Sequence, residues 1–247
     1  MAFDAPWNWL SAGWRDMWLV PEISLTYGAV FAGVAAALVG GLWLLEAQSL
    51  FLALASGFML IGPLAAVGLY ETSRRLARGE TVGLGQVVAA GLAARGQLAF
   101  LGAVLLFAFM VWLQLAFLLL MLFFGGGGLP PPSAFMQTLL FTPRGLGLLI
   151  AGSAVGGLIA AFIFAISAVA VPMLLVHKTD AVSAARASLM AVIHNPKPMA
   201  LWAGLIVVMM AAGFATLLVG FVLAFPLIGH ATWHAYADVY GGSSGGA

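Results

Sequence analysis

The sequence predicts an all-α fold: a polytopic integral membrane protein with about six transmembrane helices. Of its 247 residues, 64% are hydrophobic and only 7% are charged, whereas charged residues make up about 25% of a soluble domain. Residues 198–237 include no Asp, Glu, Lys or Arg. A straight helix of that length would reach about 60 Å, twice the ~30 Å hydrocarbon core of a bilayer, so this run is expected to fold back as two spans.

Composition also excludes several classes of protein. The chain has no cysteine, which rules out disulfides, thiolate metal sites and iron–sulfur clusters. A formal net charge of +1 gives no basis for nucleic-acid binding. The N-terminus lacks the basic segment of a signal peptide, so no cleaved leader is expected.

The chain opens with an aromatic segment, residues 6–20, which we expect to form an interfacial helix. Trp7, Trp14 and Trp18 fall on one helical face, and tryptophan favours the headgroup level because its ring is apolar and its N–H needs a partner. These residues are predicted interfacial anchors, as is Trp233 near the other end of the chain. The alternative is a simple aromatic anchor before the first span.

Six apolar runs follow, each long enough or nearly long enough to cross a bilayer. The predicted spans are residues 23–45, 47–70, 98–124, 146–176, 199–216 and 219–237. They form a single domain over residues 1–240, with a flexible Gly/Ser tail at 241–247. The open alternative is five spans, with residues 221–236 forming a re-entrant or interfacial helix.

Three prolines, Pro63, Pro172 and Pro226, each lie in the second half of an apolar run. Proline removes a backbone hydrogen bond and clashes with the preceding turn, so these are predicted helix kinks. Their placement suggests three helical hairpins, each with one straight and one proline-bearing helix.

The connections after the first two hairpins read as amphipathic helices at the interface. The first, residues 71–97, begins with Arg74, Arg75 and Arg78, which fix topology or hold lipid headgroups. The second has Asp180 as its N-cap, and its apolar face contains Val182, Ala185, Leu189, Val192 and Ile193. Residues 133–141 are expected to form a short helix at the other end of the bundle.

Small and polar residues inside the spans indicate helix packing. Gly28, Gly33 and Gly40 repeat along the first span, and Gly152 and Gly156 lie in the fourth. Small residues let helices approach closely in lipid, either within the chain or against a partner protein. Gln114, in the third span, is expected to face another helix because an unpaired amide in lipid costs free energy.

Charge distribution predicts the orientation. Eight of the nine basic residues lie in the N-terminal segment and the two amphipathic connections, and Arg144 alone lies in the opposite set of loops. By the positive-inside rule, the N-terminus and these connections face the cytoplasm, and six spans return the C-terminus to that side.

His230 and His234 are the only candidate cofactor ligands. They are four residues apart, so they share a helical face and could bind a metal or a haem. The alternative is a structural role as hydrogen-bonding residues at the cytoplasmic end of the last helix. In that case we expect them to contact the N-terminal helix or one of the amphipathic connections.

Two motifs resemble a bacterial family of predicted integral membrane proteins, domain of unknown function 2189. They are Gly13-Trp14-Arg15-Asp16, followed by Pro21, Ser24, Leu25, Tyr27 and Gly28, and the closing run from Pro226 to Tyr236. The resemblance is expected to extend over nearly the whole chain. It implies a proteobacterial inner-membrane protein with no established activity, some members of which are labelled as similar to a cytochrome oxidase subunit.

Three functions remain open. The favoured one is a non-catalytic accessory or scaffold protein that packs against a larger inner-membrane complex, such as one of electron transfer or photosynthesis. The others are a transporter of a small uncharged or zwitterionic solute or a lipid, and a haem- or metal-binding subunit that uses His230 and His234. No enzyme activity and no resident cofactor are expected, since the spans contain no carboxylate pair and no nucleophile–base pattern. The expected partners are membrane lipids and another membrane protein or complex, with no nucleic acid.

Overall fold

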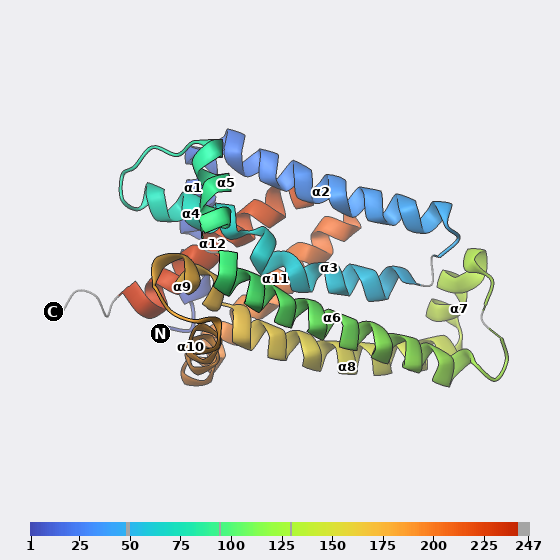
Figure 1. Ribbon diagram of the computed structural model, residues 1–247. Coiled ribbons are helices and arrows are strands. Elements are labelled where there is room, and N and C mark those ends of the chain that lie inside the picture. The colour runs from blue at the N-terminus through green and yellow to red at the C-terminus, as the bar shows by residue number, and fades with distance from the viewer. Residues whose placement is uncertain (48–49, 94, 129, 242–247) are drawn as a thin grey trace. The chain divides into compact units, whose positions relative to one another are not determined.

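The computed structural model describes residues 1–47, 50–93, 95–128 and 130–241, and every regular element in these ranges is helical (Figure 1). The predicted flexible tail therefore lies outside the described residues, except for Gly241. The elements in chain order are α1 (Ala5–Leu19), α2 (Pro21–Leu44), α3 (Phe51–Ala65), α4 (Val67–Leu76), α5 (Leu84–Ala93), α6 (Arg95–Phe124), η2 (Pro132–Ala134), α7 (Phe135–Phe141), α8 (Pro143–Ser167), α9 (Ala170–Val176), α10 (Ala181–His194), α11 (Pro196–Ala215) and α12 (Phe221–Tyr240).

These helices follow the predicted order closely. Four helical segments of the described chain have the length and apolar composition to cross a membrane: Pro21–Leu44, Gly96–Phe124, Pro143–Val176 and Pro196–Ala215. The chain is thus an all-helical protein with several membrane-spanning helices. The regions of the other two predicted spans are helical, in α3–α4 and α12, but the count of six spans stays a prediction.

The boundaries have local causes. Asp180 caps α10, because its side chain accepts a hydrogen bond from the Ser183 backbone N–H at 2.9 Å. Within the charge-free run that begins at residue 198, α11 ends at Ala215 and α12 begins at Phe221. Leu217 and Leu218 form this turn with positive φ values of 52° and 73°. The run folds back where the sequence predicted.

The three prolines behave differently. α3 ends at Ala65, two residues after Pro63, and α8 gives way to α9 at residues 168–169, four and three residues before Pro172. Pro226, by contrast, lies inside an unbroken α12. The first two prolines therefore accompany a helix break, and the third does not.

The contacts of the chain divide into two compact units. Unit 1 contains Met1–Val34, Pro63–Leu101 and the described residues from Phe164 onward. Within it, α12 packs against α1, α4, α9 and α11 (Figure 1). Trp9 of α1 and Trp202 of α11 are buried there, with their rings edge to face at 5.8 Å.

Unit 2 contains Ala35–Gly62 and Gly102–Ile163. Leu120 and Phe124 of α6 pack against Phe135 and Leu139 of α7. On the same helix, the indole N–H of Trp112 donates to the carbonyl of Ala53 in α3 at 3.0 Å. Unit 2 is thus held together mainly by apolar packing along α3, α6, α7 and α8.

Candidate functional site

The polar residues of the closing motif lie on the face of α12 that packs into unit 1. His230 has no exposed surface, and the side chain of His234 is 22% exposed. Small residues bring the neighbouring helices close. A Cβ at Gly13 of α1 would lie 2.6 Å from the backbone nitrogen of Ala231, and one at Gly229 would lie 2.6 Å from Leu69 of α4. The glycines therefore allow side chains of α1 and α4 to reach both histidines.

His230 is hydrogen-bonded through both ring nitrogens. Its Nε2 lies 2.9 Å from Ser24 Oγ of α2, and its Nδ1 lies 2.7 Å from Ser73 Oγ of α4. Both serines are completely buried. The ring therefore joins three helices that are far apart in the sequence, and it has no lone pair left for a ligand.

Asp16 of α1 continues this network. It is only 6% exposed, and it bonds Ser73 as well as His234, whose Nε2 is 2.7 Å from Asp16 Oδ2. Burial by itself raises the pKa of Asp16. The hydrogen bonds from His234 and Ser73 and the nearby histidines lower it further than burial raises it, so the pKa lies below its ordinary value of 3.8.

An ionised Asp16 fixes the direction of each bond. A carboxylate can only accept, so the Ser73 hydroxyl donates to Asp16, and Ser73 Oγ accepts from the Nδ1–H of His230. Nε2 of the same neutral ring then accepts the Ser24 hydroxyl proton. The chain Ser24, His230, Ser73, Asp16, His234, which we call the polar network, is thus satisfied at every link.

A second bond ties α1 to α12. The indole N–H of Trp9 donates to Asp238 Oδ2 at 3.0 Å. The N-terminal helix is therefore fastened to the last helix at both of its ends, through Trp9 near its start and Asp16 near its end. The expectation that the two histidines contact the N-terminal helix or one of the amphipathic connections is confirmed by the bonds to Asp16 and to Ser73 of the 71–97 segment.

The predicted headgroup arginines are largely engaged with acids. Glu71, 3% exposed at its side chain, accepts bonds from Arg74 Nε at 2.6 Å and Arg75 Nε at 2.7 Å. Burial raises the pKa of Glu71, but the hydrogen bonds and charges of the two arginines lower it to below its ordinary value. Arg78 lies 3.9 Å from Glu80. Arg74 and Arg75 thus have a structural partner that the sequence analysis did not assign.

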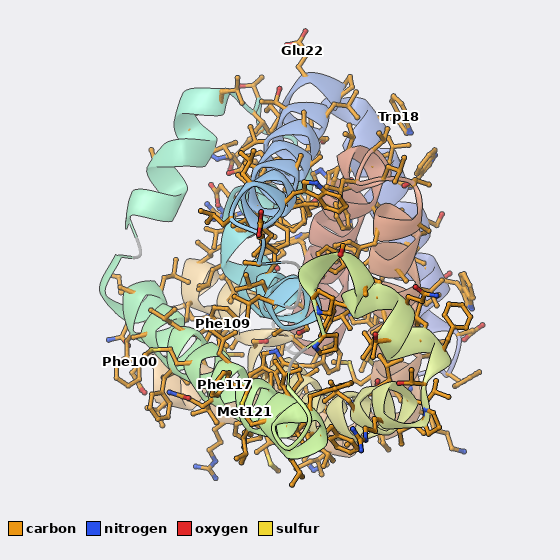
Figure 2. All side chains as sticks on the ribbon, turned by 90° about the vertical axis from the view of Figure 1, so that its right-hand side faces the viewer. Trp18, Glu22, Phe100, Phe109, Phe117 and Met121 are labelled. Carbon is orange, nitrogen blue, oxygen red and sulfur yellow. The ribbon has the colours of Figure 1, made fainter. Side chains whose placement is uncertain are left out.

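The predicted aromatic anchors divide into two groups. Trp7, Trp14 and Trp18 are exposed by 56%, 47% and 49%. Figure 2 shows Trp18 projecting outward, and Glu22 projects outward from the first turn of α2. Trp233 is only 7% exposed and packs beside Tyr236. The ring of Trp233 therefore lies against the rest of unit 1, and its place at the headgroup level stays a prediction.

The five glycines predicted to pack closely fall into two groups, those with a neighbouring helix or ring and those without. A Cβ at Gly28 would overlap the backbone of Val222 in α12, and one at Gly156 would press on the ring of Trp112. No described atom lies within 4 Å of a Cβ at Gly33, Gly40 or Gly152. Close packing, within the chain or against a partner protein, was expected at all five; Gly28 and Gly156 pack within the chain, and the other three positions are open in the described chain.

The side chain of Gln114 and several large apolar side chains of α10 are exposed. The side chain of Gln114 is exposed in the described chain, so the expectation that it faces another helix stays a prediction. On α10 the buried side chains are the small ones, Ala181, Ala184, Ser188 and Ala191, while Val182 and Ile193 of the predicted apolar face are exposed by 66% and 56%. Bulky apolar residues facing outward are typical of a helix that lies against lipid.

The residues of the polar network are poorly arranged to bind a metal ion or a haem. Among the described residues no group of three or more His, Asp or Glu side chains could hold a metal ion. A haem or metal on His230 would have to displace a serine from a fully buried ring, so the residues present do not fit such a group.

The sequence analysis missed the serines and the acid of the polar network as functional positions. Asp16 and Ser24 were noted only as part of the opening motif, and Ser73 was not noted. Only Ser24 offered a signal, because it lies between Ile23 and Leu25, where an unpaired hydroxyl costs free energy; Asp16 and Ser73 have polar neighbours in the sequence. Such a residue signals that a partner exists without saying which one.

Long apolar helices, together with a polar network that is satisfied within unit 1, define a polytopic α-helical membrane protein. The chain belongs to the family of predicted integral membrane proteins with domain of unknown function 2189, whose sequence model matches residues 50–176. The match covers the middle of the chain rather than nearly all of it, and it leaves out both motifs that carried the resemblance. No curated protein and no solved structure matches this chain.

Proposed function

We propose that this protein is a non-catalytic accessory or scaffold protein that packs against a larger complex of the bacterial inner membrane, such as one of electron transfer or photosynthesis. One observation carries the proposal: the chemically versatile side chains of unit 1 bond one another. His230 uses both ring nitrogens on serines, and Asp16 is bonded by His234 and Ser73. These residues stabilise the fold and leave little for a reaction, which also supports the proposal that the chain is not an enzyme.

The open small-residue faces support a docking role. Gly33, Gly40 and Gly152 have no described atom near the position of a Cβ. Small residues on a membrane helix let a second backbone approach closely. In this proposal these faces receive helices of the partner complex, while bound lipids cover the exposed tryptophans of α1.

The distribution of charge supports the proposed orientation. In unit 1 the connections carry eight of the nine basic residues, and Arg144 belongs to unit 2. By the positive-inside rule, this distribution supports the proposal that both termini face the cytoplasm. Labelling of single cysteines introduced at Lys197 and Arg144 tests this orientation cleanly, because the chain has no native cysteine. Labelling of both positions from the same side would contradict it.

Native purification tests the scaffold role. The full chain, tagged and expressed at its natural level, is extracted in mild detergent, and co-purifying proteins are identified. We expect a multisubunit membrane complex, and we expect Gly33→Leu with Gly40→Leu to release it. Leu158→Phe, a change at a 74% exposed position on α8, is the matched control and should retain it. Recovery of this chain with no other protein would contradict the scaffold role.

The broken helices favour transport as a second candidate. α3–α4 is interrupted at Ala66 and α8–α9 at residues 168–169, and α4 packs against α9 in unit 1. Discontinuous helices in corresponding positions can mark a transport site. Uptake of glycerol and of betaine into proteoliposomes containing the full chain tests this function, and rates equal to those of protein-free liposomes would count against it.

The haem or metal function is the least favoured candidate because of the bonds that His230 and His234 make. We expect the purified chain to have no visible absorption band that depends on either histidine. The spectrum of His234→Ala should match that of the wild type. Loss of a band in this variant would favour the ligand role over the structural one.

A further inference from the structure

One face of α6 is exposed along its length in unit 2. Positions three or four residues apart share this face, which we call the α6 stripe, and each member is exposed: Phe107, Met110, Val111, Gln114, Phe117 and Leu118. Leu105, Trp112 and Leu120 lie on the opposite side and are buried. Figure 2 shows the side chains along this helix, including Phe117 of the stripe and Phe109, which lies against Gly57 of α3.

Gln114 is the polar residue at the centre of the α6 stripe. It has no hydrogen-bond partner in the part of the chain that the structure describes. The spanning segment runs from Gly96 to Phe124, so Gln114 lies only about four residues, or ~6 Å, from its middle. That depth is inside the hydrocarbon core, where no water is available to bond an amide.

We infer that the α6 stripe is the contact surface of a homodimer, in which Gln114 of one copy pairs with Gln114 of the other. A carboxamide has both a donor NH2 and an acceptor carbonyl, so two identical amides across a twofold axis satisfy each other. A lone polar residue within an apolar helix face is known to fix pairing and register in helix dimers. The apolar residues on either side of Gln114 then pack against their own counterparts.

Cysteine cross-linking in membranes tests the interface. Because the chain has no cysteine, Met110→Cys, Val111→Cys and Phe117→Cys can be compared one at a time under mild oxidation. We expect each to give a disulfide-linked dimer on a non-reducing gel. Ile150→Cys and Leu158→Cys of α8, exposed by 71% and 74%, report random collision and should give at least fivefold less dimer. Equal cross-linking at α6 and α8 would overturn the proposal.

A second set of variants tests the amide itself. In the Phe117→Cys chain, Gln114→Leu should reduce the dimer at least fivefold, whereas Gln114→Asn, which keeps the carboxamide, should restore most of it. Position 114 is exposed, so neither change disturbs the interior, and unchanged thermal unfolding would confirm this. Undiminished dimer in the leucine variant would overturn the pairing of amides. Cross-linking of Phe117→Cys only to a protein of different mass would show another occupant and overturn the homodimer.

Discussion

Replacing His230 by leucine tests whether the polar network holds unit 1 together. Leucine has a similar volume, so the main loss is the two hydrogen bonds to Ser24 and Ser73, which leaves two buried hydroxyls without that partner. Such bonds contribute about 1–2 kcal/mol each in proteins and membrane helices, so His230→Leu should lower the free energy of unfolding by about 2–4 kcal/mol. Denaturant titration of the full chain in micelles measures it. A loss below about 0.5 kcal/mol would refute the reasoning.

A double-mutant cycle separates the bond from general damage. Ser24→Ala should cost about 1 kcal/mol in the wild-type chain. In the His230→Leu chain it should cost almost nothing, because it removes a hydroxyl that has already lost its ring partner. The coupling is then about 1 kcal/mol. Ser56→Ala, whose hydroxyl bonds only carbonyls of its own helix, is the control and should show no coupling to His230. Additive losses for Ser24 and His230 would contradict the bond.

Three further predictions follow from the close contacts and buried acids of unit 1. Gly28→Leu should lower the free energy of unfolding by about 1–3 kcal/mol or more because a Cβ there overlaps the backbone of Val222, whereas Gly33→Leu, in open space, should change it by less than about 0.5 kcal/mol; equal effects in thermal unfolding would contradict this. The folded pKa of Asp16 lies below 3.8, so its stabilisation is present above that pH and is lost as the pH falls through the folded value; Asp16→Asn should be less stable at pH 7 and flatter between pH 4 and 2, and parallel curves would argue against the assignment. Glu71→Gln should lower the free energy of unfolding by about 1–3 kcal/mol, because the buried acceptor of the bonds from Arg74 and Arg75 loses its negative charge. An unchanged thermal unfolding would show that the ion pairs are not stabilising.

The sequence was sufficient for the helices because their signals are local. The length of an apolar run, a capping Asp180 and the charged residues that bound each run all act within a few positions of the boundary they set. The polar network depends on contacts of a different kind. Ser24 and His230 are 206 residues apart in the chain, and helical periodicity assigns each to a face without naming the partner on that face.

Helix α1 illustrates the same limit. The spacing of Trp7, Trp14 and Trp18 correctly indicated one aromatic face, which the structure exposes. The opposite face carries Trp9, which is buried against Trp202, and Asp16, which bonds His234. By composition alone Trp9 does not differ from the other tryptophans. Only the close approach of α12 distinguishes a tryptophan that packs inside unit 1 from one that faces outward.

Two of the three prolines lie where a residue of another helix meets the backbone. At the break before Pro172, the N–H of Val169 finds an acceptor in Ser188 Oγ at 3.3 Å, so this N–H stays paired. Pro226 cannot donate to the carbonyl of Val222, yet α12 continues. Gly28 of α2 lies directly against that carbonyl oxygen, where a Cα–H can make a weak hydrogen bond. At each of these prolines a residue of another helix thus meets a backbone group: Ser188 of α10 accepts from the Val169 N–H at the break, and Gly28 of α2 lies against the Val222 carbonyl that Pro226 leaves without its donor.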